Sequence, residues 1–512
     1  MKLLKFCLLM IGLLQYRDIS CANQPKSNLS PDHIAVIAPT AALATAGYFS
    51  YQRVMQPKKF IINVEKLTEK NLKFPKIFAW GVSTSATQIE ESHEHHDWSQ
   101  TYLDTHFNAS HAKHHHSKLQ SPGFASESFS QWQDDIDKVA YLGANAYRFS
   151  IDWSRVQPTA HHFDHAAIEH YVRIAQDLVN KGIKPMVCLH HYSDPTWFMD
   201  HGGFSKEENI AIFMTYCNKM YKALSPYVSQ WIVISQPVAY AVKGYKVGMQ
   251  PPFLHNSGLE DIVMLNMFKA HIAVYDMMHN QYRQHKHGLQ PEVGLCHQVV
   301  QMYAARWYHP LDQIAAASGE RIYNQTLMRF FTNGHFQSLI PMRDLAYIPE
   351  APTKFDFFAL SYYCPSALQG ISRVCMHVDE ECKTADPMRV IYKEGIYDAI
   401  VQASKLGKPI YVVESGIDPK HEAQRILFLD SYLSAIAQAL VNGYDVRGYY
   451  HWTLMDNYEW GMPTDNINYG LYKNRVQDHQ TGKLHENFTN HASMLKDGGK
   501  YYKAIIAYQK QS

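Results

Sequence analysis

The chain has 512 residues, of which 46% are hydrophobic and 19% are charged, so it can bury a large core as one big barrel or as two ordinary domains. Its 48 Lys and Arg residues nearly balance 47 Asp and Glu residues, which leaves a formal charge of +1. Such a balance gives no electrostatic reason to expect nucleic acid or an anionic membrane as partner, and a small neutral molecule fits better.

The N-terminus has the pattern of an export signal. Lys2 and Lys5 flank the start of a short apolar run that ends at Leu14 and is followed by polar residues and the small-residue site Ser20-Cys21-Ala22. We therefore predict a signal peptide over residues 1–22 and an exported or membrane-anchored protein.

A second apolar stretch lies in the linker that we predict over residues 23–70. Residues 34–51 hold no acidic or basic side chain and are barely long enough to span a bilayer, which makes them a candidate transmembrane segment. They also contain Pro39 and many alanines, as a hydrophobic linker packed on the next domain would. Membrane association through this segment and packing on the domain are both open.

Cysteines and histidines give no defined site. The eight cysteines are too scattered for a disulfide framework, although Cys375 and Cys382 share a polar stretch and could pair after export. Histidines gather at residues 93–96 and 111–116, but their spacing matches no known metal site, and an exposed loop explains them. We predict no metal and no cofactor.

Eight short apolar or β-branched runs, each followed by a helical stretch, recur within residues 71–512. They are Phe78–Val82, Ala146–Ile151, Lys184–Leu189, Trp231–Ile234, Glu292–Cys296, Phe357–Leu360, Ile410–Val413 and Arg447–Trp452. Eight alternations predict an α/β fold, a single-domain (β/α)8 TIM barrel.

The helical stretch between the second and third runs has the clearest periodicity. Its apolar residues at helical spacing are Ile168, Tyr171, Val172, Ala175, Leu178 and Val179. They predict one buried face, and Gly182 predicts the end of the helix.

Polar and aromatic residues cluster at the C-terminal ends of seven of the runs. They are Gln88, Arg148, Ser150, His190, His191, Ser235, Gln236, Tyr362, Tyr363, Glu414, Trp452, Asp456, Asn457, Glu459 and Trp460. Because active sites of this fold are assembled at the C-terminal face of the barrel, we predict that this face carries the site.

Several ordered motifs together resemble glycoside hydrolase family 1, the β-glucosidase and β-galactosidase group. They are Phe78–Glu90, Tyr147–Arg155, Leu189–Pro195, Tyr392–Tyr397, Gly448–Trp460 and Tyr469–Tyr472. The resemblance extends from about Phe74 to Lys510. It implies a retaining mechanism that proceeds through a covalent glycosyl-enzyme.

The resemblance also implies the roles of individual residues. Glu414 matches the nucleophile, and Arg148 and Tyr363 would lie beside it and support it. The residues expected to bind the sugar are Gln88, His191, Ser235, Tyr363, Trp452, Glu459 and Trp460. The expected partner is a small β-glycoside or an oligosaccharide.

The chain departs from the family around one subsite. The family motif Asn-Glu-Pro, which contains the acid/base glutamate, is Ser235-Gln236-Pro237 here, and Ser361 and Ser415 each replace an asparagine. Loss of the general acid typically removes about 10² to 10⁴ of the rate for poor leaving groups. Plant thioglucosidases of the same family carry the same glutamine, although they retain the asparagine that is Ser235 here.

Three hypotheses follow. The first is a β-glycosidase-type enzyme that hydrolyses or transfers β-linked O- or S-glycosides with an impaired or redirected acid/base step; Asp194 or His190 could take over the acid role. The second is a catalytically inactive carbohydrate-binding pseudoenzyme. The third is a structural or interaction role with a vestigial pocket.

Overall fold

Eight parallel strands form a closed barrel in the computed structural model, which describes residues 74–108, 118–337, 344–370, 372–376, 378–386, 388–461, 467–478 and 481–511. The barrel strands are β1 (Ala79–Ser83), β2 (Ala146–Ser150), β3 (Lys184–His190), β4 (Gln230–Ile234), β5 (Glu292–Gln298), β9 (Phe357–Ser361), β12 (Ile410–Ser415) and β13 (Val446–Trp452). Each strand pairs with its neighbours in chain order, and β13 closes onto β1. The predicted (β/α)8 barrel is confirmed, and each predicted strand lies within two residues of an observed one at either end.

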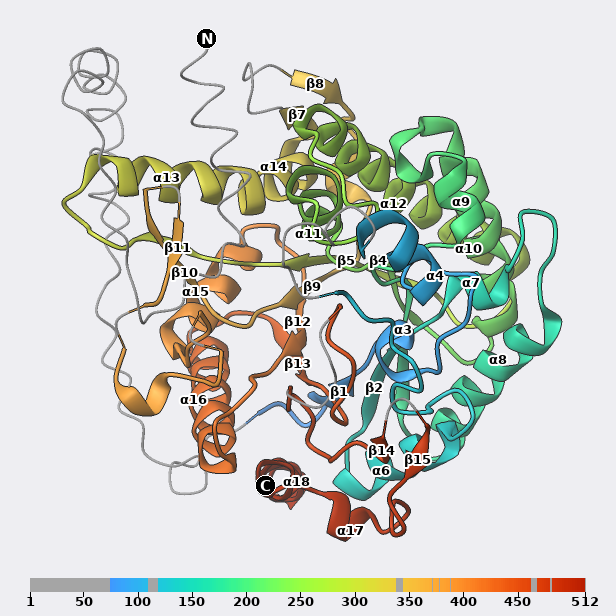
Figure 1. The fold of residues 1–512 in the computed structure, drawn as a ribbon, viewed down its shortest axis with the longest axis vertical. Helices are drawn as coiled ribbons and strands as arrows, with labels where there is room; N and C mark the ends of the chain where they lie inside the picture. The colour runs from blue at the N-terminus through green and yellow to red at the C-terminus, as the bar shows by residue number, and fades with distance from the viewer. Residues whose placement is uncertain are drawn as a thin grey trace.

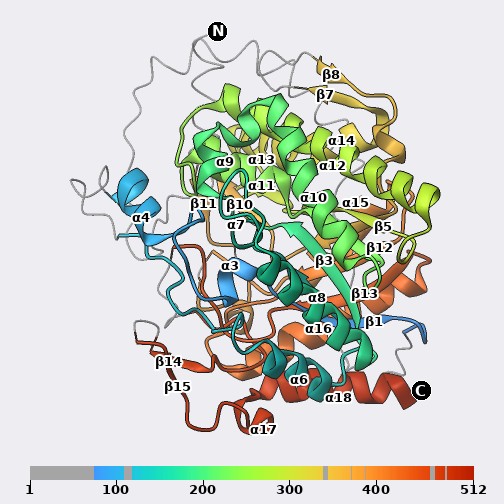
Figure 2. The same cartoon turned by 90° about the vertical axis from the view of Figure 1, so that its right-hand side faces the viewer.

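Helices surround the barrel (Figure 1). The long ones are α6 (Trp132–Leu142), α8 (His165–Asn180), α10 (Ile210–Leu224), α12 (Ser257–His285), α13 (Pro310–Glu320), α14 (Thr326–Asn333), α15 (Lys393–Ser404), α16 (Glu422–Val441) and α18 (Asp497–Gln511). The last helix, α18, contacts α6 and α16, and the two views agree that α6 and α18 lie at the same end of the molecule (Figure 2). The C-terminal helix thereby completes the outer ring.

Shorter elements complete the connections. They are the helices α3 (Ala86–Ile89), α4 (Gln100–Leu103), α7 (Trp153–Val156), α9 (Thr196–Asp200), α11 (Pro237–Ala241) and α17 (His491–Met494), with the π or 3-10 turns η2 (Asp104–Asn108), η4 (Gly203–Ser205), η5 (Glu207–Asn209), η6 (Val242–Val247), η7 (Arg321–Gln325), η8 (Ala351–Thr353) and η9 (Glu380–Cys382). The strands outside the barrel are β6 (Met302–Ala304), β10 (Ser366–Gln369) and β11 (Ser372–Val374), which form one sheet, and the pairs β7 (His335–Gln337) with β8 (Asp344–Tyr347) and β14 (Val476–Asp478) with β15 (Lys483–Leu484).

Helix α8 shows how local sequence sets an element. The carboxylate of Asp164 caps the helix by accepting from the backbone N–H groups of Ala166 and Ala167. The chain leaves the helix through Gly182, whose φ of +71° favours glycine, as predicted. The prediction that Val179 is buried is wrong: its side chain is 44% exposed, and Ile174 is buried instead. The apolar stripe therefore lies slightly to one side of the predicted face.

Alternation along the strands decides which side chains face the barrel interior. On β2, Ala146 belongs to the small cluster inside the barrel, whereas Tyr147 and Phe149 pack outward against the helices. Side chains two residues apart share a face, so Arg148 points inward above Ala146. The strand sequence thus carries a charged side chain into the barrel mouth.

Strand β12 interrupts this alternation at its end. Tyr411 and Val413 face the barrel interior and Val412 faces outward, so strict alternation would turn Glu414 toward the helices. The pairing of β12 shifts register after Val412 against both β9 and β13. Such irregularities re-aim side chains next to functional sites, and here the Glu414 carboxylate meets Arg148.

The predictions about the N-terminal segments are not tested by the structure. The predicted signal peptide (1–22) and candidate transmembrane segment (34–51) lie outside the described residues and stay predictions. Within the residues that the structure describes, no helix is both long and apolar enough to cross a membrane. The prediction that Cys375 and Cys382 could form a disulfide is wrong, because Cys382 carries a free thiol.

Candidate functional site

The carboxylate of Glu414 lies at the centre of a hydrogen-bond cluster at the barrel mouth. Arg148 Nη1 donates to its Oε1, and both side chains are buried in an ion pair. Its Oε2 accepts from Gln236 Nε2 at 2.7 Å and from Tyr363 Oη at 3.0 Å. Three strands that are far apart in the sequence therefore supply donors to one carboxylate, as the convergence of strand ends predicts.

Arg148 links this carboxylate to the fourth strand. Its Nη2 donates to Ser235 Oγ at 3.0 Å. Burial alone would lower the pKa of Arg148, but the adjacent Glu414 carboxylate raises it above its ordinary value. The guanidinium is therefore a permanent positive charge, and it holds the Glu414 and Ser235 side chains in fixed positions.

Gln236 is held from both ends of its amide. Nε2 donates to Glu414, and Oε1 accepts from Tyr192 Oη at 2.7 Å. Both Gln236 (φ +49°) and Tyr192 (φ +64°) have left-handed backbone conformations, as does Trp460 (φ +29°). Non-glycine residues adopt this region rarely, and strained backbone tends to cluster at functional sites.

A second carboxylate, Glu459, lies close to Gln88. Gln88 Nε2 donates to Glu459 Oε1 at 3.3 Å and to the Tyr458 carbonyl at 2.7 Å, and the Trp452 side chain also hydrogen-bonds to Glu459. The Gln88 side-chain oxygen Oε1 accepts from Ser85 Oγ. The first and last barrel strands thus bring together an amide, a carboxylate and an indole, which can all bind hydroxyl groups.

Aromatic rings extend from this group toward Glu414. The His191 ring lies parallel to those of Trp452 and Trp460, with centroids 5.9 and 6.2 Å away. His191 Nε2 is 4.0 Å from Glu414 Oε1. All ten residues predicted for the site are therefore linked in one network, and their roles toward a ligand stay predictions.

Burial sets the protonation of this network. It raises the pKa of Glu459 to about 7, although Arg389 acts in the opposite direction. Burial, with a contribution from Arg148, lowers the pKa of His191 well below its ordinary value, so this ring is neutral at pH 7. Burial and the Glu414 carboxylate raise the pKa of Tyr363, which keeps its hydroxyl as a donor.

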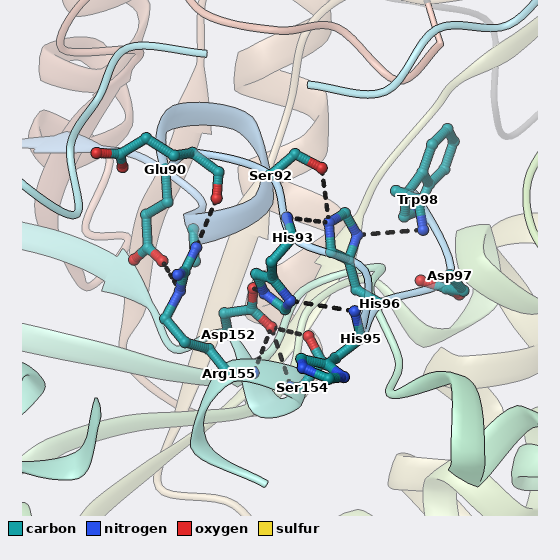
Figure 3. A network of polar contacts seen from close by, with 12 residues as sticks. Glu90, Ser92, His93, His95, His96, Asp97, Trp98, Asp152, Ser154 and Arg155 are labelled. Atoms are coloured by element: carbon teal, nitrogen blue, oxygen red, sulfur yellow. Dashed lines mark hydrogen bonds and ion pairs between the residues drawn. The ribbon is translucent and has the colours of Figure 1, made fainter. Parts of the chain in front are cut away.

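The loop after α3 is fixed by a separate polar network (Figure 3). His93 Nε2 contacts Asp152 Oδ2 at 2.8 Å, and Glu90 accepts from Arg155 and from Tyr171 Oη. Burial raises the pKa of Glu90 to about 8 despite the Arg155 charge. The network joins the start of α7 to the segment that follows Gln88, so it positions that side of the site.

The prediction that the histidine-rich stretch is an exposed loop is wrong for one of its residues. His96 is buried rather than exposed, and its Nδ1 accepts from the backbone N–H of Trp98 at 3.2 Å. Within the described residues, no three His, Cys, Asp or Glu side chains could hold a metal ion. The second histidine run, His111–His116, lies outside the described residues.

Two other pairs from the strand ends have partners other than Glu414. Asp194 accepts from Tyr240 Oη and contacts His190 Nε2 at 3.1 Å, and no hydrogen bond or ion pair in the described residues joins either member to Glu414. Asp456 pairs with Lys496 at 2.6 Å. These residues support the structure around the site.

Two residues that shape the site are not predicted from the sequence. Tyr192 lies in the Leu189–Pro195 motif, which predicts no role for it, although it holds the Gln236 amide. Gly416 follows β12, where a Cβ would collide with the backbone carbonyl of Trp452. No pattern signals the first contact, whereas an isolated glycine directly after a strand can signal a close backbone approach.

Comparisons with known proteins agree with this arrangement. The family model described as Glycosyl hydrolase family 1 matches residues 70–511. The chain is 25% identical over 470 residues to β-glucosidase A of Acetivibrio thermocellus, covering 85% of this chain and 98% of that one. It is 26% identical over 459 residues to β-glucosidase 13 of Arabidopsis thaliana, covering 78% and 87%. A solved β-glycosidase from Pyrococcus horikoshii is similar with a TM-score of 0.73 and 28% identity, covering 86% and 96%.

The ion pair between Arg148 and Glu414 predicts strong energetic coupling. Because both groups are buried, Arg148→Met or Glu414→Gln alone should each lower the free energy of unfolding by about 3–5 kcal/mol, since each leaves its partner unpaired. The double variant should cost clearly less than the sum, as measured by urea unfolding. Arg447→Met, at the half-exposed pair with Asp445, is the control and should cost under about 1 kcal/mol. Additive losses at Arg148 and Glu414 would contradict the coupling.

Glu459 predicts a pH-dependent difference in stability. Burial raises the pKa of Glu459 from 4.5 to about 7, so in this interval the folded protein keeps a proton that the unfolded chain has released. The stability from this group is fully present below pH 4.5 and is lost as the pH rises through 7. The free energy of unfolding of the wild type, relative to that of Glu459→Gln, should therefore fall as the pH rises across this interval. A flat or rising difference would refute the assignment.

Proposed function

The chain belongs to glycosyl hydrolase family 1, and from that premise we propose that it is a β-glucosidase-like retaining glycosidase with an altered acid/base step. The observation that carries the proposal is the buried Glu414 carboxylate with three donors on its two oxygens. A carboxylate that is desolvated, oriented and ionised is what a nucleophile for glycosyl transfer needs. The proposed substrate is a small β-linked glycoside or an oligosaccharide.

Glu414 acts in the first step of the proposed reaction. One of its oxygens attacks the anomeric carbon, and an ester bond to the sugar forms as the bond to the leaving group breaks. Arg148 and Tyr363 hold the carboxylate in position for this attack. Gln88, Glu459 and Trp452 are proposed to bind sugar hydroxyls, with His191, Trp460 and Ser235 completing the sugar site.

Gln236 changes how the leaving group departs. It occupies the position that matches the acid/base glutamate of the family, and an amide has no proton to give at neutral pH. The leaving group must therefore depart with the bonding electrons as an anion, so that groups whose conjugate acids are strong are favoured. In the second step, water attacks the anomeric carbon, the ester bond to Glu414 breaks and releases the free carboxylate, and the water gives its proton to a base from solution.

The contact of Gln236 with Glu414 also affects substrate entry. The two carboxyl groups of a retaining glycosidase stand about 5 Å apart, with the scissile bond between them. Here Gln236 Nε2 is 2.7 Å from Glu414 Oε2, because an amide N–H can donate where a second carboxylate would repel. We propose that this amide rotates away from Glu414 when a glycoside binds.

An inactive carbohydrate-binding protein is the second candidate. It is favoured by the joint replacement at Ser235 and Gln236. By resemblance to the family, Ser235 stands in place of an asparagine that contacts the sugar 2-hydroxyl. Contacts that strengthen in the transition state are worth several kcal/mol in this chemistry. Under this alternative, the sugar pocket binds but Glu414 does not react.

Leaving-group dependence separates these candidates. The wild type should hydrolyse a 2,4-dinitrophenyl β-glycoside, whose phenolate needs no proton, far faster than the phenyl β-glycoside. Gln236→Glu should accelerate the phenyl substrate by about 10² to 10⁴ and the dinitrophenyl substrate much less, because only the first needs a general acid. The measurement is the initial rate of hydrolysis of both substrates, each in its gluco and galacto form.

The dinitrophenyl substrate is the internal control, and unfolding curves check that the variant is folded. If a folded Gln236→Glu variant and the wild type both leave the dinitrophenyl substrate intact, the enzyme proposal is wrong. The inactive candidate then stands.

A further inference from the structure

A cavity of about 90 Å³ lies beside the Glu414 cluster. Its walls come from η6, η7 and the segments that follow β5 and β9. Tyr363 lines the cavity and also donates to Glu414, and η6 follows α11, which begins directly after Gln236. The cavity therefore adjoins the carboxylate on the side of Tyr363, where we place the leaving group.

The walls of this cavity carry charge of one sign. Four cations line it, Lys243, Lys246, Arg373 and Arg389, and no Asp or Glu is among its lining residues. The whole chain has a formal charge of only +1, so the excess of positive over negative side chains at this cavity is a local feature. Positive clefts with low-dielectric walls attract anions.

Two of the four charges are paired. Lys246 Nζ lies 2.9 Å from Glu260, and both side chains are buried. Arg389 Nε lies 3.3 Å from Asp386, in a pair that is partly exposed. These carboxylates offset the charges of Lys246 and Arg389 in part.

Lys243 and Arg373 make no ion pair with a carboxylate of the described residues. The ammonium of Lys243 lies 5.2 Å from the centroid of the Tyr192 ring, the tyrosine that holds Gln236. Arg373 Nη2 donates to the Met388 carbonyl at 2.7 Å, while its Nε is buried without a hydrogen-bond partner. A buried donor of this kind is costly unless a ligand satisfies it.

We propose that this cationic pocket, defined by Lys243, Lys246, Arg373 and Arg389, binds an oxyanion such as a carboxylate or sulfate on the leaving group of the glycoside. The inference rests on the proposed function and adds the class of leaving group to it. Lys243 and Arg373 supply N–H donors to the oxyanion. Their charges also stabilise the electrons that the departing atom keeps when Gln236 cannot protonate it.

The test compares two thioglycosides that differ only in charge. The dissociation constants of 4-carboxyphenyl and 4-(hydroxymethyl)phenyl 1-thio-β-glycosides are measured by calorimetry, in gluco and galacto forms. The wild type should bind the carboxylate about tenfold more tightly at low salt, and the preference should shrink as salt is added. Lys243→Met and Arg373→Met should each reduce the preference about threefold to fivefold, and the double variant should abolish it.

Lys206→Met is the matched control, because Lys206 is exposed and does not line the pocket. It should retain the full preference. Equal binding of the two thioglycosides by the wild type, or a preference that survives in the double variant, would overturn the proposal.

A second measurement tests anion binding in the pocket independently of sugar binding. Free 4-nitrobenzoate and 4-nitrobenzyl alcohol carry no sugar, so their binding does not depend on the proposed glycosidase function. If no thioglycoside binds but the benzoate is still preferred in the wild type and not in the double variant, the proposed function fails and the anion site stands. If neither the thioglycosides nor the free benzoate show a charge preference, the anion site is refuted.

Discussion

The negative charge of a buried carboxylate must be balanced by nearby charges and hydrogen-bond donors. At the barrel mouth, the side chains around Glu414 are arranged to balance its charge. Arg148 supplies a full positive charge, and Tyr363 and Gln236 supply hydrogen bonds to the other oxygen. An uncompensated charge at this depth would cost several kcal/mol. Strands β2, β4, β9 and β12 must therefore end with their side chains in register with one another, and the barrel provides that alignment.

Under the proposed function, the glutamine at position 236 alters the chemistry more than the architecture. Its amide is accepted beside Glu414 because it donates a hydrogen bond, whereas a second carboxyl group would have to carry a raised pKa at the same place. The protein thereby gains a hydrogen bond to Glu414, and under the proposed function it has no proton donor at this position. The cationic pocket beyond Tyr363 would supply electrostatic stabilisation to a leaving group that departs as an anion.

The sequence predicted the barrel and the convergence of the site residues, because both follow from the alternation of strands and helices and from polar residues at strand ends. It could not predict that Glu414 reaches the mouth through a register shift, since Val413 on the same strand faces the interior. Neither could it predict the Tyr192 contact, which depends on a left-handed backbone at a non-glycine residue. His96 is buried through tertiary contacts that the histidine run does not reveal.

We propose that Glu414 is a reactive nucleophile and that position 236 carries no proton donor. The most direct test is to incubate the protein with a 2,4-dinitrophenyl 2-deoxy-2-fluoro-β-glycoside and to digest it for mass spectrometry. We expect a fluoroglycosyl adduct on the peptide that contains Glu414, and no adduct in Glu414→Gln. Sugar binding without an adduct on Glu414 would contradict it.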